Sequence, residues 1–169
     1  MDCLKNNGPK DTMEVCMKLA SAIMIQSGKA NDENESNALL MNLIENGTAY
    51  EKFEEMVSTQ GGNLNAAQHR PQYGTTIKAE NDGIIQMMDT TQIGWGLVDM
   101  GCGRKQKDDI LDPTAGLECH RKVGDEVLIG EKLFTCFCNN EKKLKSGVEK
   151  ISNAVSIGPE PVEISLFYN

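Results

Sequence analysis

The first third of the chain alternates apolar and polar residues with the period of an amphipathic helix. Pro9 and Asp11 are helix-start signals, and Gly28 is a stop signal. Between them the apolar residues recur at spacings of three and four, which places them on one helix face: Met13, Cys16, Met17, Ala20, Ile23 and Met24. The pattern therefore predicts a first helix that ends near Gly28.

Two more helices are predicted after the polar residues 31–34. The second carries apolar residues at helical spacing up to Asn46-Gly47, namely Leu39, Leu40, Leu43 and Ile44. Thr48 and Glu51 form a capping-box pattern, which predicts that a third helix begins with Thr48 as its cap. Three short helices joined by brief turns bury little apolar surface by themselves, so we expect apolar side chains to be exposed on this segment.

The period changes from helix to strand after the polar residues 63–72. Residues 75–79 and 84–88 flank Asn81-Asp82-Gly83, a tight-turn signal that predicts a hairpin. A short helix is expected from about Thr91 to Met100.

The last part of the chain combines strands, one helix and a closing strand. The block from Gly116 to Phe137 is typical of strands around two turns. A helix is predicted from Leu144, Val148, Ile151 and Val155, although Gly147 weakens it. Pro159 and Pro161 lead into a predicted strand at residues 162–167.

These elements predict an α+β protein with N-terminal helices and a C-terminal α/β lobe. Residues 1–62 form the helical segment, residues 63–72 a linker, and residues 73–169 the lobe. Within the lobe, residues 79–85 and 123–133 resemble the two hairpins of a biotinyl/lipoyl-type β-sandwich, which predicts a barrel-sandwich arrangement. A carrier of that type displays a lysine at a hairpin tip, whereas Met87-Met88-Asp89 occupies this position here, so we do not expect a cofactor carrier.

Charge and the length of the apolar stretches disfavour several classes of function. Lysine and arginine number 17 and aspartate and glutamate 25, which gives a net charge of −8 and disfavours a partner held through nucleic-acid phosphates. The longest apolar stretches are too short to span a bilayer, and the N-terminus lacks the pattern of a signal peptide. We therefore expect a cytoplasmic protein that binds neither nucleic acid nor membrane.

The six cysteines allow two interpretations. Cys119, His120, Cys136 and Cys138 could form a zinc site, but their spacing departs from that of structural zinc ligands. Reduced cysteines that pack on apolar faces are the favoured interpretation. No metal site is predicted.

Few other residues suggest chemistry. Residues 101–104, Gly-Cys-Gly-Arg, could cradle a phosphate, but no P-loop lysine follows, and a turn that lets a helix abut the sheet is favoured. Cys102 has no recognisable activating base, and neither His69 nor His120 has a triad partner at a recognisable spacing. The run from Lys105 to Asp112 is most simply a solvated charged loop.

Several short motifs in order resemble the C-terminal part of the thymidine/pyrimidine-nucleoside phosphorylase family. Residues 53–62, FEEMVSTQGG, and residues 100–104, MGCGR, are similar to segments of this family. Asp108-Asp109-Ile110-Leu111-Asp112 and Gly116-Leu117 follow the second segment, and a Gly124-Asp125 turn comes next at the expected distance. Cys102 departs from the family, which usually has alanine or glycine there.

The resemblance implies a pentosyltransferase of nucleoside salvage, in which phosphate displaces the base of a pyrimidine (deoxy)nucleoside. The family's phosphate- and base-binding motifs have no counterpart here, so no catalytic or substrate-binding residue is assigned, and this chain alone is expected to be inactive. The complete enzyme is expected to be a homodimer that needs no cofactor beyond the co-substrate phosphate. A gating loop is the one predicted site, with Gly101, Gly103, Arg104, Asp109 and Asp112 as its residues. The alternative is a non-catalytic structural or interaction module.

Overall fold

The computed structural model describes residues 1–65 and 70–167. The chain divides into two compact units, Met1–Ala67 with Leu166–Asn169, and Gln68–Ser165. His69 lies outside the described residues. Among the residues that are described, no helix combines the length and the apolar character that a membrane crossing requires.

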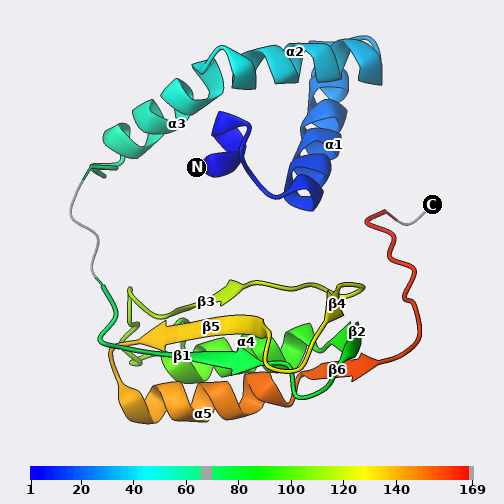
Figure 1. Ribbon diagram of the computed structural model, residues 1–169. Helices are drawn as coiled ribbons and strands as arrows, with labels where there is room; N and C mark the ends of the chain where they lie inside the picture. Colours follow the sequence, from blue (N-terminus) through cyan, green and yellow to red (C-terminus); the bar gives the residue numbers. More distant parts are fainter. Residues whose placement is uncertain (66–69, 168–169) are drawn as a thin grey trace. The chain divides into compact units, whose positions relative to one another are not determined.

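The first unit is built from helices (Figure 1). A short 3-10 helix at Asp2–Lys5 is followed by α1 (Lys10–Gln26), α2 (Glu33–Glu45) and α3 (Thr48–Thr59). Helix α1 packs on α2, and α2 packs on α3. The three predicted helices are confirmed, and Gly28 adopts the left-handed conformation (φ 69°) that ends a helix.

The start of α3 differs from its prediction. Gly47, with φ 84°, is the N-cap, so Thr48 is the first residue of the helix. The Asn46 side-chain oxygen accepts a hydrogen bond from the Thr48 amide at 2.9 Å. The capping box is therefore wrong, because the Glu51 amide, from which the Thr48 hydroxyl was expected to accept a hydrogen bond, donates to the Gly47 carbonyl at 3.0 Å.

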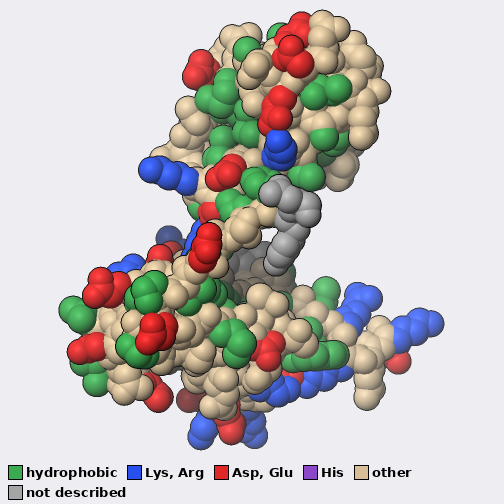
Figure 2. All heavy atoms as spheres, turned by 90° about the vertical axis from the view of Figure 1, so that its right-hand side faces the viewer, with side chains coloured by type: hydrophobic (Ala, Val, Ile, Leu, Met, Phe, Trp, Pro, Cys, Tyr) green, Lys and Arg blue, Asp and Glu red, His purple; other side chains and the backbone are tan. Residues whose placement is uncertain are grey.

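Apolar side chains remain exposed on this unit, as expected from the sequence. Leu19 and Ile23 of α1 are 62% and 65% exposed, whereas the buried residues of α1 and α2 are the small Ser21 and Ser36. Figure 2 shows hydrophobic side chains, in green, at the surface of this unit. The fully buried residues of α1 and α2 are thus small, while Met17, Leu40 and Ile44 are half-buried and Leu19 and Ile23 remain largely in solvent.

The second unit combines six strands and two helices among its described residues. Their bounds are β1 Tyr73–Lys78, β2 Gly83–Met88, α4 Thr90–Met100, β3 Gly116–Cys119, β4 Glu126–Val127, β5 Lys132–Cys138, α5 Glu141–Ser152 and β6 Val155–Gly158. The strands form two antiparallel sheets with the orders β1-β5-β3 and β4-β2-β6 (Figure 1). The predicted mixture of helices followed by an α/β unit is confirmed.

The strands on either side of Asn81-Asp82-Gly83 do not pair with each other. Strand β1 pairs with β5, whereas β2 pairs with β4 and β6. Ala79 continues the pairing of β1, because its amide donates to the Glu131 carbonyl and its carbonyl accepts from the Gly130 amide. The predicted hairpin is therefore wrong: the turn reverses the chain locally, but it carries the chain from one sheet to the other.

The C-terminal predictions also need correction. Helix α5 ends at Ser152, and Val155 begins strand β6. The predicted strand at residues 162–167 is wrong, since these described residues are irregular. Pro159 and Pro161 lack the amide donors that would extend the pairing of β6 with β2.

The core of the second unit lies between the sheets and the two helices. Its fully buried members come from different elements: Ile85, Met100, Val127, Phe134, Cys136, Cys138 and Ile151. Helix α5 packs on α4, β5 and β1.

Helices α4 and α5 cross at two glycines. A Cβ atom on Gly96 would lie 2.9 Å from the Gly147 carbonyl oxygen, and one on Gly147 would lie 2.6 Å from the Gly96 carbonyl oxygen. Gly147, a weak helix residue in isolation, is therefore required by the close approach of the two backbones.

Candidate functional site

The predicted gating loop begins where α4 ends. Gly101 adopts φ 106° and caps the helix, and its amide donates to the Val98 carbonyl. The Cys102 amide donates to the Leu97 carbonyl at 3.0 Å. This geometry makes the start of residues 101–104 a turn that ends α4.

A phosphate cradle at this turn is not supported by the geometry. The turn lies at the C-terminal end of a helix, where the helix dipole repels anions. The amides of Gly101 and Cys102 are already bonded to carbonyls of α4, so they are not free for a ligand. Arg104 is exposed.

Asp109 closes a local turn within the loop. Its carboxylate accepts hydrogen bonds from the amides of Lys105 at 2.8 Å and Gln106 at 3.0 Å. These hydrogen bonds, first that from Gln106, hold the pKa of Asp109 below its usual range. Asp109 therefore shapes the loop as an ionised acceptor.

Asp112 fastens the far end of the loop. Its carboxylate accepts from the Asn139 amide at 2.6 Å and from the Thr114 hydroxyl at 2.7 Å, and its own amide donates to the Gly101 carbonyl at 3.0 Å. Burial acts to raise the pKa of Asp112, but the hydrogen bonds from Asn139 and Thr114 outweigh burial, and the pKa is lower than usual. The two ends of the loop thus meet at Gly101 and Asp112.

Asp99 is a further residue at this site that sequence reasoning missed. Its side chain is only 4% exposed and forms ion pairs with Lys105 of the loop and with Lys150 of α5, the latter at 2.7 Å. The Ser146 hydroxyl donates to it at 3.1 Å. The contact with Lys105, then that with Lys150, lowers the pKa of Asp99 to about 2. The available signal was a lone carboxylate between Val98 and the core residue Met100.

A cavity of about 360 Å³ lies between the loop and the two helices. Asp99 and Lys105 line it, as do three of the predicted residues, which are Gly101, Gly103 and Asp109. The α5 side contributes Lys142, Lys143 and Ser146. Arg104 and Asp112, the other two predicted residues, are not among the lining residues, so the structure brings together only part of the predicted set.

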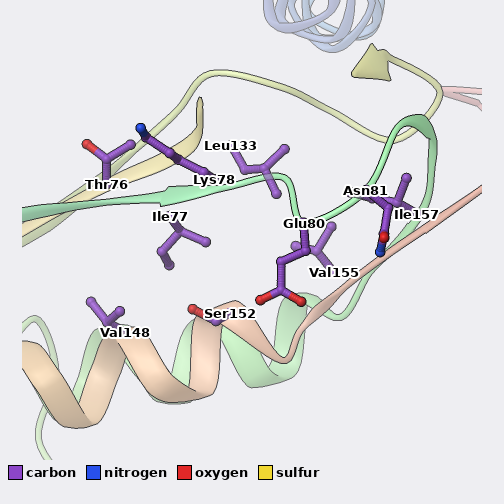
Figure 3. Close-up of a pocket in the computed structure, with 10 residues that line it drawn as sticks. All are labelled: Thr76, Ile77, Lys78, Glu80, Asn81, Leu133, Val148, Ser152, Val155 and Ile157. Atoms are coloured by element: carbon purple, nitrogen blue, oxygen red, sulfur yellow. The ribbon is translucent and has the colours of Figure 1, made fainter. Parts of the chain in front are cut away.

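A second cavity, of about 270 Å³, lies between β1 and the end of α5 (Figure 3). Val148, Val155 and Ile157 give it apolar walls, and Glu80 directs its carboxylate toward the Ser152 end of α5 in the close-up. None of the predicted site residues lines this cavity.

Two of the six cysteines are buried as packing groups, whereas Cys16, Cys102 and Cys119 are exposed. Cys136 and Cys138 are fully buried, which confirms the favoured interpretation for these two residues. His120 contacts the Thr135 hydroxyl at 2.7 Å, and the exposed Cys119 donates to the Arg121 carbonyl. Within residues 1–65 and 70–167 no group of three or more metal-ligating side chains is brought together.

The thiols of Cys102 and Cys136 are not activated for nucleophilic chemistry. Burial raises the pKa of Cys136 to about 11, and burial followed by the charge of Asp112 raises the pKa of Cys102. A raised pKa lowers the fraction of reactive thiolate at neutral pH. Cys102 therefore packs beside the loop without the character of a nucleophile.

Comparison with known proteins agrees with the motifs in the chain. Residues 84–158, which span most of the second unit, match the family model of the pyrimidine nucleoside phosphorylase C-terminal domain. This segment of the chain is therefore similar to that C-terminal domain.

The similarity extends beyond that domain. The chain is 31% identical over 173 aligned residues to the pyrimidine-nucleoside phosphorylases of Staphylococcus aureus strains bovine RF122 / ET3-1 and USA300. The alignment covers 99% of this chain but 40% of those relatives. The resemblance to a C-terminal portion of the pyrimidine-nucleoside phosphorylase family is confirmed.

Proposed function

We propose that this chain supplies the C-terminal portion of a pyrimidine-nucleoside phosphorylase. Such a pentosyltransferase uses phosphate to displace the base of a pyrimidine (deoxy)nucleoside and forms (deoxy)ribose 1-phosphate. The observation that carries the proposal is the similarity over 99% of the chain to enzymes of that name. The chain spans about 40% of their length, so the remaining part of the enzyme would supply the groups that bind phosphate and base.

The role proposed for this portion is that of scaffold and cleft wall. Its three aspartates around the loop are engaged with protein donors, since Asp99 pairs with lysines and Asp109 and Asp112 accept backbone amides. Groups committed in this way hold a structure together and are not available as acids or bases for a substrate.

Further features of the complete enzyme follow as proposals. It would be a cytoplasmic homodimer with inorganic phosphate as co-substrate and no organic cofactor or metal on this portion. The net charge of −8 supports the absence of a nucleic-acid partner. For the fold, we propose that the two three-stranded sheets form a barrel-sandwich arrangement, supported by the crossing of the chain from one sheet to the other at Asn81-Asp82-Gly83.

The chain alone is expected to show no phosphorolysis. The test is phosphate-dependent release of uracil or thymine by the purified chain. A chimera in which this chain replaces the matching 40% of the Staphylococcus aureus enzyme is expected to regain turnover. Turnover by the chain alone would contradict the assignment of catalysis to the part of the enzyme that this chain does not match. An inactive but folded chimera would favour the alternative, an interaction module, which the exposed apolar residues of α1 also suit.

The loop from Gly101 to Asp112 is proposed to gate the cleft of the complete enzyme. Arg104→Ala in the active chimera is expected to lower kcat/KM by about tenfold. The reason is that the substituted loop would close over the phosphate site with one cation fewer. Lys107→Ala removes the same charge from the same exposed loop and serves as the matched control. Equal kinetics for the Arg104→Ala chimera and its parent would contradict the gating role.

A further inference from the structure

A buried carboxylate connects the loop to the helices beneath it. Asp99 lies in the last turn of α4, and its two oxygens pair with lysines from different elements, Lys105 of the loop and Lys150 of α5. The side chains of Lys105 and Lys150 are 53% and 46% exposed, respectively. The two lysines are therefore similar in exposure and differ mainly in the element to which they belong. Asp99 thus lies between α5 and the loop.

The amides of Gly101 and Cys102 join the start of the loop to α4, and beyond Cys102 the other hydrogen bonds hold the loop to itself or at its far end. Asp109 bonds to the amides of Lys105 and Gln106 within the loop, and Asp112 bonds to Asn139 where the loop ends. Across residues 105–111, the Lys105–Asp99 pair is the only hydrogen bond or ion pair to α4 or α5 that the structure records.

Apolar packing does not replace this contact. Of the two apolar side chains of the loop, Ile110 is 88% exposed and Leu111 is 42% exposed, so Leu111 alone is partly covered. The cavity of about 360 Å³ separates the loop from the first turns of α5, where Lys142 and Lys143 lie. A loop with little apolar burial and with a cavity beneath it has low local stability, so a single ion pair to a buried partner has a large influence on its position.

We propose that Asp99 is a positioning residue that fixes the near end of the Gly101–Asp112 loop through Lys105. Lys150 and Ser146 hold the Asp99 carboxylate in place, so that the loop has one anchor at Lys105 and a second at Asp112. Residues 106–111, with Ile110 at the surface, are the part free to move. The idea that this anchor serves gating rests on the proposed function. The anchoring of the loop by Asp99 and Lys105 does not depend on it.

Hydrogen exchange in a matched pair of variants tests the anchor. Lys105→Met and Lys150→Met each remove one cation from Asp99 and keep an unbranched side chain. In Lys105→Met the amides of residues 105–109 are expected to exchange about tenfold faster, while those of α5 keep their rates. In Lys150→Met the amides of the loop are expected to stay within about twofold of the parent rates, because Lys105 still holds Asp99.

Equal exchange of the loop in the two variants, or no change in Lys105→Met, would overturn the proposal. The measurement uses the 169-residue chain and no substrate, so its outcome is independent of the proposed phosphorylase activity. In the active chimera, Lys105→Met is expected to change kcat about tenfold while Lys150→Met does not. Faster amide exchange of the loop in Lys105→Met together with an unchanged kcat would support the anchor but contradict a role for it in gating.

Discussion

Replacing Gly147 with alanine is expected to destabilise the second unit by about 2 kcal/mol or more. The new methyl group would lie 2.6 Å from the Gly96 carbonyl oxygen, and it would also meet the Met100 side chain. A backbone oxygen cannot move away without shifting α4, so the two helices must separate. The gain of about 1 kcal/mol in helix propensity on replacing glycine is too small to offset this.

Gly94 of α4 provides a matched control for this prediction. A Cβ atom there meets nothing within 4 Å, so Gly94→Ala is expected to raise stability by up to about 1 kcal/mol. Trp95 is the one tryptophan of the chain and lies in α4, so its fluorescence reports unfolding of this unit in denaturant titrations. Destabilisation by both substitutions, or by neither, would contradict the close crossing of the helices.

Replacing Asp99 with asparagine is expected to lower the free energy of unfolding at pH 7 by about 2 kcal/mol. The folded pKa of about 2 lies below the ordinary value of 3.8, so the ionised form is favoured by folding. This contribution is fully present above about pH 5, falls as the pH decreases through 3.8, and is lost below about pH 2.

Denaturant titrations at pH 7 and near pH 2 measure this dependence. The difference between the parent and Asp99→Asn is expected to shrink toward zero at the lower pH. Asp108→Asn removes the same charge from the exposed loop and is expected to change stability by less than about 0.5 kcal/mol at either pH. A stability difference for Asp99→Asn that does not depend on pH would contradict the ion pairs with Lys105 and Lys150.

Local backbone requirements were well predicted from the sequence. Glycines at positions 28, 101, 124 and 130 adopt positive φ at the turns that their sequence context indicated. Helices α1, α2 and α4 follow from apolar residues at helical spacing, because that pattern and the end signals lie within a few residues of each other. The same short motifs, in order, carried the resemblance to the phosphorylase family.

Features that depend on distant residues were predicted incorrectly or missed. Strand β1 pairs with β5, almost sixty residues away, rather than with β2 across an adjacent turn. The ion pairs of Asp99 join a helix to a loop on one side and to α5 on the other. A lone aspartate in an apolar stretch does not reveal its partner, since a side chain finds its partner through the packing of whole elements.

The sequence by itself determined the class of fold, the turns at Gly101 and Gly124, and the resemblance to the pyrimidine-nucleoside phosphorylase family. Only the tertiary structure decided that two sheets share the strands, that Gly96 and Gly147 allow α4 and α5 to touch, and that Asp99 fastens the loop. The physical reason is the separation along the sequence of the residues that determine each feature. Backbone angles and helix periodicity are set by neighbouring residues, whereas strand partners, helix crossings and buried ion pairs are selected by which distant surfaces bury each other best.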